Sequence, residues 1–373
     1  MKKSLITRLH QFEKVASSKS SMQLGYPLNL SANFRELFQN FDFSLLLNNI
    51  GDPVTTWSAS NRFFFEKEVL EYFADLYLLD KKEMRGYVTS GGSEGNLYGL
   101  YLGRENYPHS VLLFSESSHY SIPKYAKLLK MPYEVVKSQP NGEMDYKDLE
   151  NKVAKLRHKS IIVSLNIGTT MSGAIDDIVQ VCNVLAIHNE DYYIHCDAAL
   201  FGSMIPFLYD KNPVNFLHKI GSLSISGHKF FGTPTPCGIV LTRNKYVENI
   251  KSVPGYTGSE DTTILGSRSG HAPIFLWYAI KAKNKLSHKK DVVMCINLAK
   301  YLHSQIQEFD SSALINQDSN IVTFNKPSEF IVSKWKLAVE KDQAHVVVMP
   351  HVTREILGDF INDLKTSLLK ERK

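Results

Sequence analysis

The sequence predicts an α/β fold built around a mostly parallel sheet, and three observations support this class. Between residue 85 and about residue 243, short apolar runs alternate with longer amphipathic segments, as they do in repeated strand–helix–strand units. Asp177 is a suitable helix N-cap, and the apolar residues after it repeat on one helical face. The chain has 373 residues, of which 43% are hydrophobic, so it can fill a large core.

Seven apolar runs are predicted to form the strands of this sheet. They are Gly86–Thr89, Val111–Phe114, Tyr133–Val136, Ile161–Leu165, Tyr192–His195, Ser222–Ser226 and Gly238–Leu241. Helices are expected in the intervals between these runs. Residues 139–142 (QPNG) are predicted to form a turn, and Asp145 is a candidate N-cap for the helix that follows.

The pattern along the chain predicts three regions. They are a helical arm at residues 1–50, a large α/β domain at 51–270, and a smaller C-terminal α+β domain at 271–373. In the arm, apolar residues from Leu5 to Ala16 recur at helical spacing, which predicts an amphipathic helix. Residues 246–265 lose the strand–helix rhythm and collect glycine and proline, so a long loop is expected there, of the kind that often acts as a lid.

Composition and charge exclude several classes of protein. The 43 Lys and Arg residues against 38 Asp and Glu give a formal net charge of +5, without a basic block, so nucleic acid is not an expected partner. No apolar run reaches membrane length, and no membrane partner is expected. The four cysteines are widely spaced and form no zinc-binding pattern, which predicts a reduced, cytoplasmic enzyme without a metal.

The most informative motif is Ser226–Gly232 (SGHKFFG), which directly follows a predicted buried strand. A single lysine at the end of a strand is usually a surface cation. Lys229, however, lies beside His228 and an apolar Phe-Phe pair, and both desolvation and nearby positive charge lower the pKa of an amine. These are the surroundings of a nucleophilic lysine that forms a Schiff base.

A second motif lies 32 residues earlier, where Asp197 ends an otherwise apolar strand and Ala199 follows two positions later. An aspartate in this position can simply be a helix N-cap. If Lys229 holds a pyridoxal cofactor, Asp197 could instead be the anion that keeps a pyridine nitrogen protonated, and only the protonated ring is a good electron sink. The small side chain of Ala199 would leave room for the face of that ring.

Two further motifs follow the first two predicted strands. In residues 89–96 (TSGGSEGN), a strand end passes through glycines into a helix, so bare backbone amides lie at a helix N-terminus, where phosphate is favoured. The motif lacks the Lys-Ser/Thr ending of a nucleotide-binding P-loop. In residues 117–121 (SSHYS), His119 could stack on an aromatic cofactor, although a lone histidine at a strand end is more often a core residue or a cap.

Together these motifs occur in the order found in group II pyridoxal-phosphate-dependent amino-acid decarboxylases. The ordered set is TSGGSEGN, SHY, the NIGTT of residues 166–170, HCDAA and SGHK. The chain resembles the branch that contains bacterial histidine decarboxylases and plant-type serine decarboxylases, and the resemblance runs from about residue 25 to residue 350. It implies pyridoxal 5′-phosphate as cofactor, an aspartate-aminotransferase-like fold (fold type I of pyridoxal-phosphate enzymes), and a homodimer or higher homo-oligomer.

The resemblance also implies a role for individual residues. Lys229 would hold the cofactor as a Schiff base, and Asp197 would contact the pyridine nitrogen. His119 would stack on the ring and line the substrate site, with Ala199 against the opposite face. The remaining residues expected to contact the cofactor are Ser90, Gly91, Ser226 and His228 near the phosphate, and Thr169.

The reaction implied is decarboxylation of an L-amino acid, and a proton must then be returned to Cα. Lys229, His228 and Tyr256 are the candidate donors, and Tyr256 lies in the expected lid. Ser93 departs from the pattern of the family, because relatives commonly have threonine at this position.

Residues 68–76, 99–105 and 139–146 look more like histidine decarboxylases, whereas 48–53, 194–202 and 270–278 look more like serine decarboxylases. Decarboxylation of L-histidine to histamine is the preferred prediction, with L-serine to ethanolamine as the alternative. Transamination or aldol cleavage on the same fold is a rival reaction. A catalytically inactive binding protein is a rival from another class, against which the presence of both Asp197 and Lys229 argues.

Overall fold

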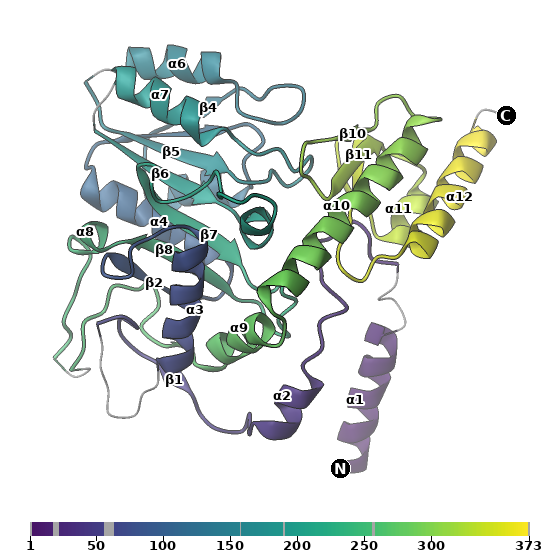
Figure 1. Cartoon of the computed structure of the whole chain (residues 1–373), viewed down its shortest axis with the longest axis horizontal. Helices are drawn as coiled ribbons and strands as arrows, with labels where there is room; N and C mark the ends of the chain where they lie inside the picture. Colours follow the sequence, from purple (N-terminus) through teal and green to yellow (C-terminus); the bar gives the residue numbers. More distant parts are fainter. Residues whose placement is uncertain are drawn as a thin grey trace. The chain divides into compact units, whose positions relative to one another are not determined.

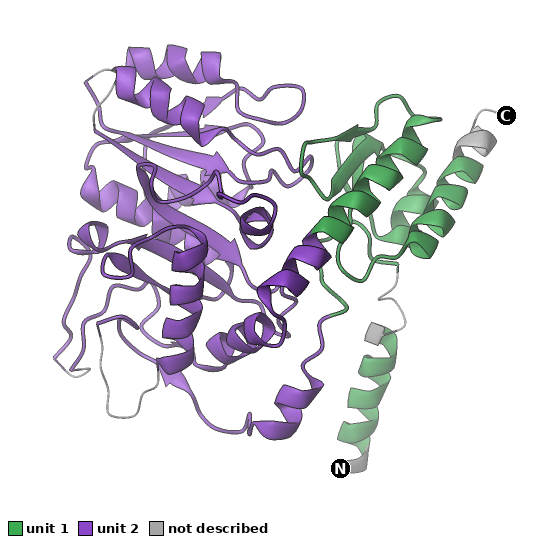
Figure 2. Cartoon of the chain, viewed as in Figure 1, with its two compact units in different colours: residues 1–31, 293–373 green, residues 32–292 purple. Residues whose placement is uncertain are grey.

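The computed structural model describes residues 2–17, 22–55, 63–156, 158–188, 191–255 and 258–371. The chain forms two compact units, shown in Figure 2. The large unit comprises residues 32–292, and the small unit comprises residues 1–31 and 293–373. The sequence predicted boundaries near residues 50 and 270. The second division of the structure instead falls within one continuous helix, α10 (Lys285–Gln307), where composition gives no signal of a boundary.

The large unit is built on a seven-stranded sheet, whose strands all include the runs predicted from the sequence. They are β2 (Met84–Thr89), β3 (Val111–Ser115), β4 (Tyr133–Val136), β5 (Ile161–Asn166), β6 (Tyr192–Asp197), β7 (Ile220–Ser226) and β8 (Gly238–Arg243). Their order across the sheet is β2-β8-β7-β6-β5-β3-β4. Strand β8 pairs antiparallel with both of its neighbours, and the other pairs are parallel. The predicted α/β class with a mostly parallel sheet is confirmed.

This topology places the carboxyl ends of six strands at one edge of the sheet, because only β8 runs in the opposite direction. In open α/β sheets, ligands bind in the crevice outside this edge. The segments that follow β2, β3, β5, β6 and β7 all leave from it, and they carry the motifs singled out in the sequence.

Helices connect and cover the strands of the large unit (Figure 1). They are α2 (Arg35–Asn40), α3 (Phe64–Leu76), α4 (Gly92–Asn106), α5 (Ser121–Leu128), α6 (Tyr146–Lys155), α7 (Ile178–His188), α8 (Asn244–Val247) and α9 (His271–Lys281), with short 3-10 turns η1 (Phe201–Ser203) and η2 (Ile205–Phe207). The two predicted caps are confirmed. Asp145 accepts from the amides of the first turn of α6, and Asp177 does the same for α7.

Helix α4 packs closely against β6, β7 and β8 because glycines line the face that it turns to the sheet. A Cβ atom on Gly95 would lie 2.1 Å from Ser224 Oγ, and one on Gly99 would lie 2.1 Å from His195 Nδ1. Real Cβ contacts are never so short, so any larger residue at either position would push the helix away from the sheet. The helix therefore brings its other buried side chains within hydrogen-bonding distance of the strands.

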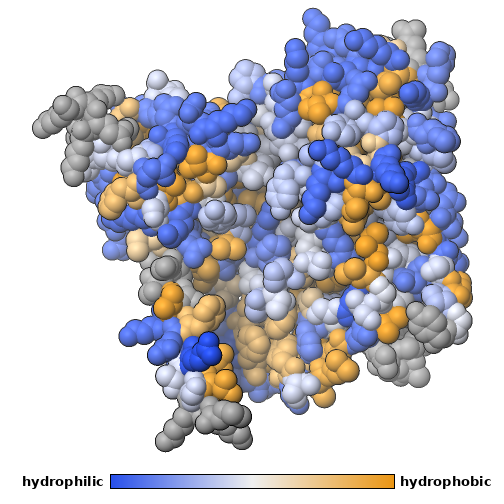
Figure 3. Space-filling model, turned by 180° about the vertical axis from the view of Figure 1, so that it is seen from behind, coloured by the Kyte–Doolittle hydropathy of each residue, from blue (hydrophilic) through white to orange (hydrophobic). Residues whose placement is uncertain are grey.

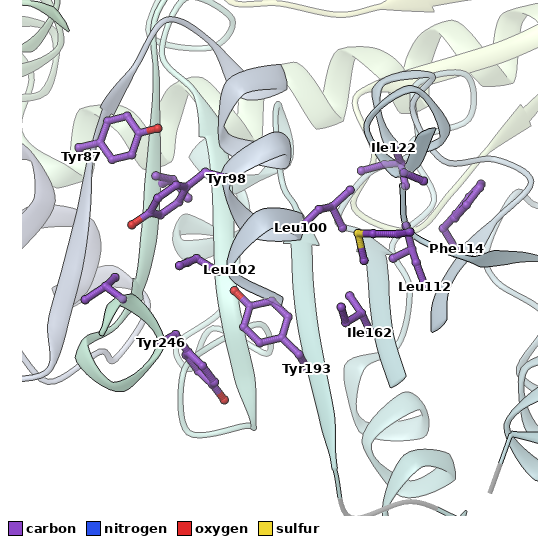
Figure 4. Close-up of a cluster of buried hydrophobic side chains, with 14 residues drawn as sticks. Tyr87, Tyr98, Leu100, Leu102, Leu112, Phe114, Ile122, Ile162, Tyr193 and Tyr246 are labelled. Atoms are coloured by element: carbon purple, nitrogen blue, oxygen red, sulfur yellow. The ribbon is translucent and has the colours of Figure 1, made fainter. Parts of the chain in front are cut away.

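The second half of α4 contributes to an apolar core beside the sheet, shown in Figure 4. Tyr98, Leu100 and Leu102 of the helix pack there with Ile162 of β5 and Tyr193 of β6, and all five side chains are fully buried. Burial of aliphatic and aromatic side chains on this scale is the main source of stability in a domain of this size.

A buried ion pair ties a short two-stranded ribbon to this domain. Strands β1 (Asn48–Asn49) and β9 (Arg268–Ser269) pair antiparallel, and the Arg268 guanidinium lies 3.2 Å from a Glu66 carboxylate oxygen of α3. Glu66 also accepts from Asn49 Nδ2 at 2.6 Å and from the Val88 amide at 2.8 Å. Because a buried charge is costly unless it is paired and hydrogen-bonded, these contacts fix both segments on the helix.

The loop between α8 and β9 corresponds to the predicted long loop. In its described part, Ser252 and Asp261 exchange two backbone hydrogen bonds of 2.9 Å and so join its two arms. Tyr256, which follows Ser252 in the sequence and precedes Asp261, lies outside the described residues.

The small unit has its own antiparallel sheet, of order β10-β11-β13-β12. Its elements are α1 (Lys2–Ser17), β10 (Leu314–Ile315), β11 (Ile321–Asn325), α11 (Glu329–Trp335), β12 (Ala338–Glu340), β13 (Gln343–Val347) and α12 (Arg354–Glu371). The helix predicted near the N-terminus is present as α1. In the part of the chain that the structure describes, no helix combines the length and apolar character needed to cross a membrane.

Candidate active site

The predicted site residues gather at the carboxyl edge of the large sheet. Gly91 follows β2, and a Cβ placed on it would lie 3.9 Å from the His228 ring, which follows β7. A Cβ on the next residue, Gly92, would lie 2.5 Å from Ser226 Oγ and 3.5 Å from the Ala199 Cβ. Turns from three strands therefore meet here, and the absence of side chains on the glycines keeps space open between them.

Lys229 is half-buried at this edge. Burial lowers the pKa of its amine, because the charged form loses hydration, and the nearby negative charge of Asp197 opposes this effect. An amine with a lowered pKa has a larger neutral, nucleophilic fraction. The structure thus provides the surroundings that the sequence motif predicted.

Asp197 is the last residue of β6 and is only 7% exposed. Its carboxylate accepts a hydrogen bond from Asn96 Nδ2 at 2.7 Å and another from the Ala199 amide at 3.2 Å. The second bond is the capping contact considered from the sequence. The first bond comes from helix α4 and fixes one carboxylate oxygen.

His119 follows β3 and interacts electrostatically with both Asp197 and Lys229. Its Nδ1 atom lies 2.8 Å from Ser121 Oγ and 3.3 Å from the Ser121 amide nitrogen. Burial lowers the pKa of the imidazole, the Asp197 carboxylate raises it, and Lys229 lowers it further. The ring is therefore favoured in its neutral form, which suits contact with a flat aromatic molecule.

His228 is held by the start of β8. Its Nδ1 atom lies 2.9 Å from the Cys237 carbonyl oxygen, which can only accept, so Nδ1 carries the proton. Burial lowers the pKa of this ring, the Cys237 hydrogen bond raises it, and Lys229 lowers it. The neutral ring then presents an unprotonated Nε2.

The glycine-rich turn has an internal arrangement that the sequence did not reveal. Glu94 reaches back to accept from the Ser90 amide at 2.7 Å and from the Ser90 hydroxyl at 2.6 Å, and Tyr87 donates to its other oxygen. The hydrogen-bond donors of Ser90 are thus engaged within the turn. An anion would find its donors one step further on, at the first turn of α4, where helix geometry leaves amide hydrogens without helical partners.

Among the described residues, Thr169 is a predicted site residue whose side-chain hydrogen bonds lie within its own loop. The Thr169 hydroxyl pairs with Ser172 Oγ at 2.9 Å and accepts from the Ala174 amide at 3.0 Å, so it stabilises the loop after β5. Tyr256 lies outside the described residues. Both assignments stay predictions.

Comparison with known proteins shows the family to which this chain belongs. Residues 44–325 match the model of the pyridoxal-dependent decarboxylase conserved domain, which is more than half of the chain and includes every predicted site residue. The chain belongs to this family. Among curated relatives, it is 44% identical to serine decarboxylase 2 of Oryza sativa subsp. japonica, over 93% of the chain and 74% of that protein. It is 39% identical to the histidine decarboxylase of Vibrio campbellii, over 96% of the chain and 95% of that protein.

Solved structures of other decarboxylases share the fold. An L-methionine decarboxylase from Streptomyces sp.590 superposes with a TM-score of 0.86 at 24% identity, over 97% of this chain and 94% of that one. The fold is thus that of fold type I pyridoxal-phosphate enzymes, as the resemblance implied.

The residues at the carboxyl edge fit the cofactor of this family. They include an amine of lowered pKa, a buried carboxylate, a neutral imidazole and a helix N-terminus beside Ser226. These groups match the aldehyde, the pyridine nitrogen, the ring face and the phosphate of pyridoxal phosphate, respectively. The chain is an enzyme, a decarboxylase that uses pyridoxal phosphate.

Sequence reasoning missed several polar residues that support this site. Asn96, Ser121, Glu94 and His195 all hydrogen-bond to predicted site residues or to their partners. Asn96 carried one usable signal, since it lies on α4 between glycines 92 and 99, on the buried face. A polar residue on a glycine-lined, buried helix face is a candidate for contact with the neighbouring strands.

Proposed function

We propose that this decarboxylase converts L-histidine to histamine and carbon dioxide. The observation that carries the reaction is the meeting of Lys229, Asp197 and His119 at one sheet edge, where burial lowers the pKa of both the Lys229 amine and the His119 imidazole. The choice of histidine is supported by relatives of nearly the same length, since the Vibrio campbellii histidine decarboxylase is covered over 95% of its chain.

In this proposal, Lys229 would hold the cofactor covalently through Nζ, and Asp197 would hold a proton on the pyridine nitrogen. When bound, pyridoxal phosphate supplies an electron sink that accepts the electron pair left at Cα when carbon dioxide departs. An anion beside the ring nitrogen strengthens that sink, because it favours the protonated ring. The two hydrogen bonds to Asp197 hold the carboxylate in place for this contact.

His119 and Ala199 would lie against opposite faces of the ring, and His119 would also line the substrate site. The phosphate would lie at the first turn of α4, beside Ser226 and His228. The amides of that turn and the positive end of the helix dipole favour an anion there. Ser90 borders this position, although its donors already bind Glu94.

The return of a proton to Cα requires an acid near Lys229. The Nζ atom of Lys229 would be the first candidate, because a free amine there could carry the proton close to where the cofactor would be held. His228 is a weaker candidate, since its lowered pKa favours a neutral ring whose one proton is bonded to the Cys237 carbonyl. Tyr256 stays the third candidate, from the loop that is expected to act as a lid.

Serine is the alternative substrate, with ethanolamine as product. It is favoured by the 44% identity with the rice serine decarboxylase, the higher of the two identities. Histidine needs a pocket for an imidazole ring, whereas serine needs only a small polar pocket, so one enzyme is expected to prefer one of them strongly.

A carbon-dioxide-release panel decides between these substrates. The holoenzyme is supplied separately with histidine, serine, aspartate, glutamate and aromatic amino acids, and carbon dioxide and amine are both quantified. We expect equal amounts of carbon dioxide and histamine from histidine, and little release from serine. Turnover of serine alone would establish the alternative, and keto-acid formation without carbon dioxide would contradict decarboxylation altogether.

We also infer that the enzyme is a cytoplasmic homodimer or higher homo-oligomer. Its four cysteines are free thiols, which suits a reducing compartment. Helix α1 exposes the large apolar side chains Leu5, Ile6, Leu9, Phe12 and Val15. Figure 3 shows apolar side chains reaching the surface among charged ones on one face of the molecule. Such exposure is typical of surfaces that are covered in an assembly, and sedimentation equilibrium of the full chain would give the number of subunits.

A further inference from the structure

We propose that Asn96 is a positioning residue for the cofactor site. Its hydrogen bonds fix the orientation of the Asp197 carboxylate and, through Ser121, the ring nitrogen of His119 that carries the proton. Asn96 is only 1% exposed and lies on α4. Its Nδ2 atom lies 2.7 Å from Asp197 Oδ2 and 3.0 Å from Ser121 Oγ, and its Oδ1 atom lies 3.0 Å from His195 Nε2. One amide thus contacts two side chains of β6 and one at the start of α5, which follows β3.

The chemistry of these partners determines where each proton lies on the β6 side. An ionised carboxylate can only accept, so the amide nitrogen of Asn96 must face Asp197 and its oxygen must face His195. Because that oxygen also only accepts, the proton of His195 must be on Nε2. Burial lowers the pKa of His195 to about 4, so the ring is neutral near pH 7 and its Nδ1 accepts from the Ser222 hydroxyl at 2.8 Å.

The same reasoning determines the state of His119. Nδ2 of Asn96 donates to Ser121 Oγ, which leaves the hydrogen of that hydroxyl free to donate to His119 Nδ1. The Ser121 amide also points at Nδ1, from 3.3 Å. Nδ1 therefore accepts, and the single proton of the neutral ring is on Nε2. His119 thus presents an N–H group on the side of the ring away from Ser121.

The arrangement is supported by close packing of the helix against the strands. The glycines at 95 and 99 set α4 against β6 and β7, and Ser224 Oγ of β7 donates to the Gly92 carbonyl at 3.0 Å. A positioning residue on packed helix and strand elements holds its partners more accurately than one on a loop. Removing Asn96 would free the Asp197 carboxylate to rotate and would leave the proton position on His119 undetermined.

This inference concerns the cofactor and does not depend on which amino acid is the substrate. It is tested with the full-chain enzyme and pyridoxal phosphate labelled with nitrogen-15 in the ring, without substrate. Two quantities are measured: the dissociation constant of the cofactor, and the chemical shift of the ring nitrogen, which reports its protonation. The substrate panel could therefore contradict histidine as the substrate while this test supports the role of Asn96. The opposite combination of results is also possible.

The variants are Asn96→Ala and Asn96→Asp, of which the second keeps the size of the side chain. We expect either variant to weaken cofactor binding roughly tenfold, as loss of a charge-assisted hydrogen bond does, and to move the ring-nitrogen shift toward the unprotonated value. Ser121→Ala removes the hydroxyl that links Asn96 to His119 but keeps the hydrogen bond from Asn96 to Asp197. It should therefore leave the ring-nitrogen shift unchanged.

The matched control is Asn106→Ala at the other end of α4. Asn106 is also partly buried, and its Nδ2 donates to the carbonyls of Leu102 and Tyr246, away from the site. This control should leave both quantities as in the wild type. The proposal is overturned if a folded Asn96 variant keeps the wild-type ring-nitrogen shift, or if Asn106→Ala changes that shift as much as Asn96→Ala does.

Discussion

The two halves of helix α4 lie against the same sheet but face different surroundings. The first half, from Gly92 to Asn96, lies at the carboxyl edge, where its contacts are hydrogen bonds to Asp197, Ser121 and Ser224. The second half, from Tyr98 to Asn106, packs into the apolar core with Leu112 and Tyr193. Both halves have a fully buried face, so position along the strands, and not burial, separates the polar site from the stabilising core. This separation predicts that catalysis and stability can be impaired independently.

The largest effect is expected from Lys229→Ala on the site side of this comparison. Loss of the amine that we propose binds the cofactor covalently should reduce turnover by roughly a thousandfold or more. The free energy of unfolding of the apoenzyme should change little, since the amine is a half-buried cation whose desolvation already costs stability. Initial rates and chemical denaturation of the same preparations measure the two quantities. Lys283→Ala, which removes an exposed ion pair with Asp291, is the control and should change neither.

Leu100→Ala tests the core side. Leu100 is fully buried, and its truncation should reduce the free energy of unfolding by about 2 to 5 kcal/mol, through lost burial and the cavity left behind. Turnover per folded molecule should stay near the wild-type value. Leu128→Ala, at a position 63% exposed, should cost less than about 0.5 kcal/mol. A large loss of turnover in folded Leu100→Ala would show that the two halves of α4 are not separable.

The smallest effect is expected in the pH dependence of stability. It concerns His195, which contacts Asn96 near the border between the two halves of α4. His195 has a pKa of about 4 in the folded state, below its usual 6.5, so the unfolded chain binds more protons between these values. Stability should therefore be complete above about pH 6.5 and fall as the pH decreases toward 4, with His195 contributing roughly 3 kcal/mol at most. In His195→Gln, which can keep both hydrogen bonds, the decline of the melting temperature over this range should be shallower. Equal slopes in both proteins would contradict this assignment.

Much of the fold could be predicted because local signals were strong. Each of the seven strands appeared as a short apolar run, and Asp145 and Asp177 marked helix starts through their capping chemistry. The direction of β8 could not be predicted, because an apolar run carries no information about its orientation in the sheet. The division inside α10 was equally hidden, since one continuous helix belongs to both units.

The candidate site was predictable where residues follow strands, and not where distant contacts matter. Asp197 and Lys229 could be paired because both end or follow strands of a parallel sheet. The contact of Asn96 with Asp197 spans 101 residues of sequence and depends on how closely a glycine-lined helix approaches the sheet. The hydrogen bonds from Ser90 to Glu94 were missed for a different reason. A sequence motif indicates which residues can donate a hydrogen bond, but it does not show which residue accepts it.

The most direct test of the central claim is to find where the cofactor is attached. The holoenzyme is reduced with borohydride, digested, and the peptide that carries the phosphopyridoxyl group is sequenced by mass spectrometry, with Lys229→Ala treated in parallel. The account predicts a single modified residue, Lys229, and no stable attachment in the variant. Attachment to another lysine in the wild type, or a borohydride-reducible link in Lys229→Ala, would contradict it.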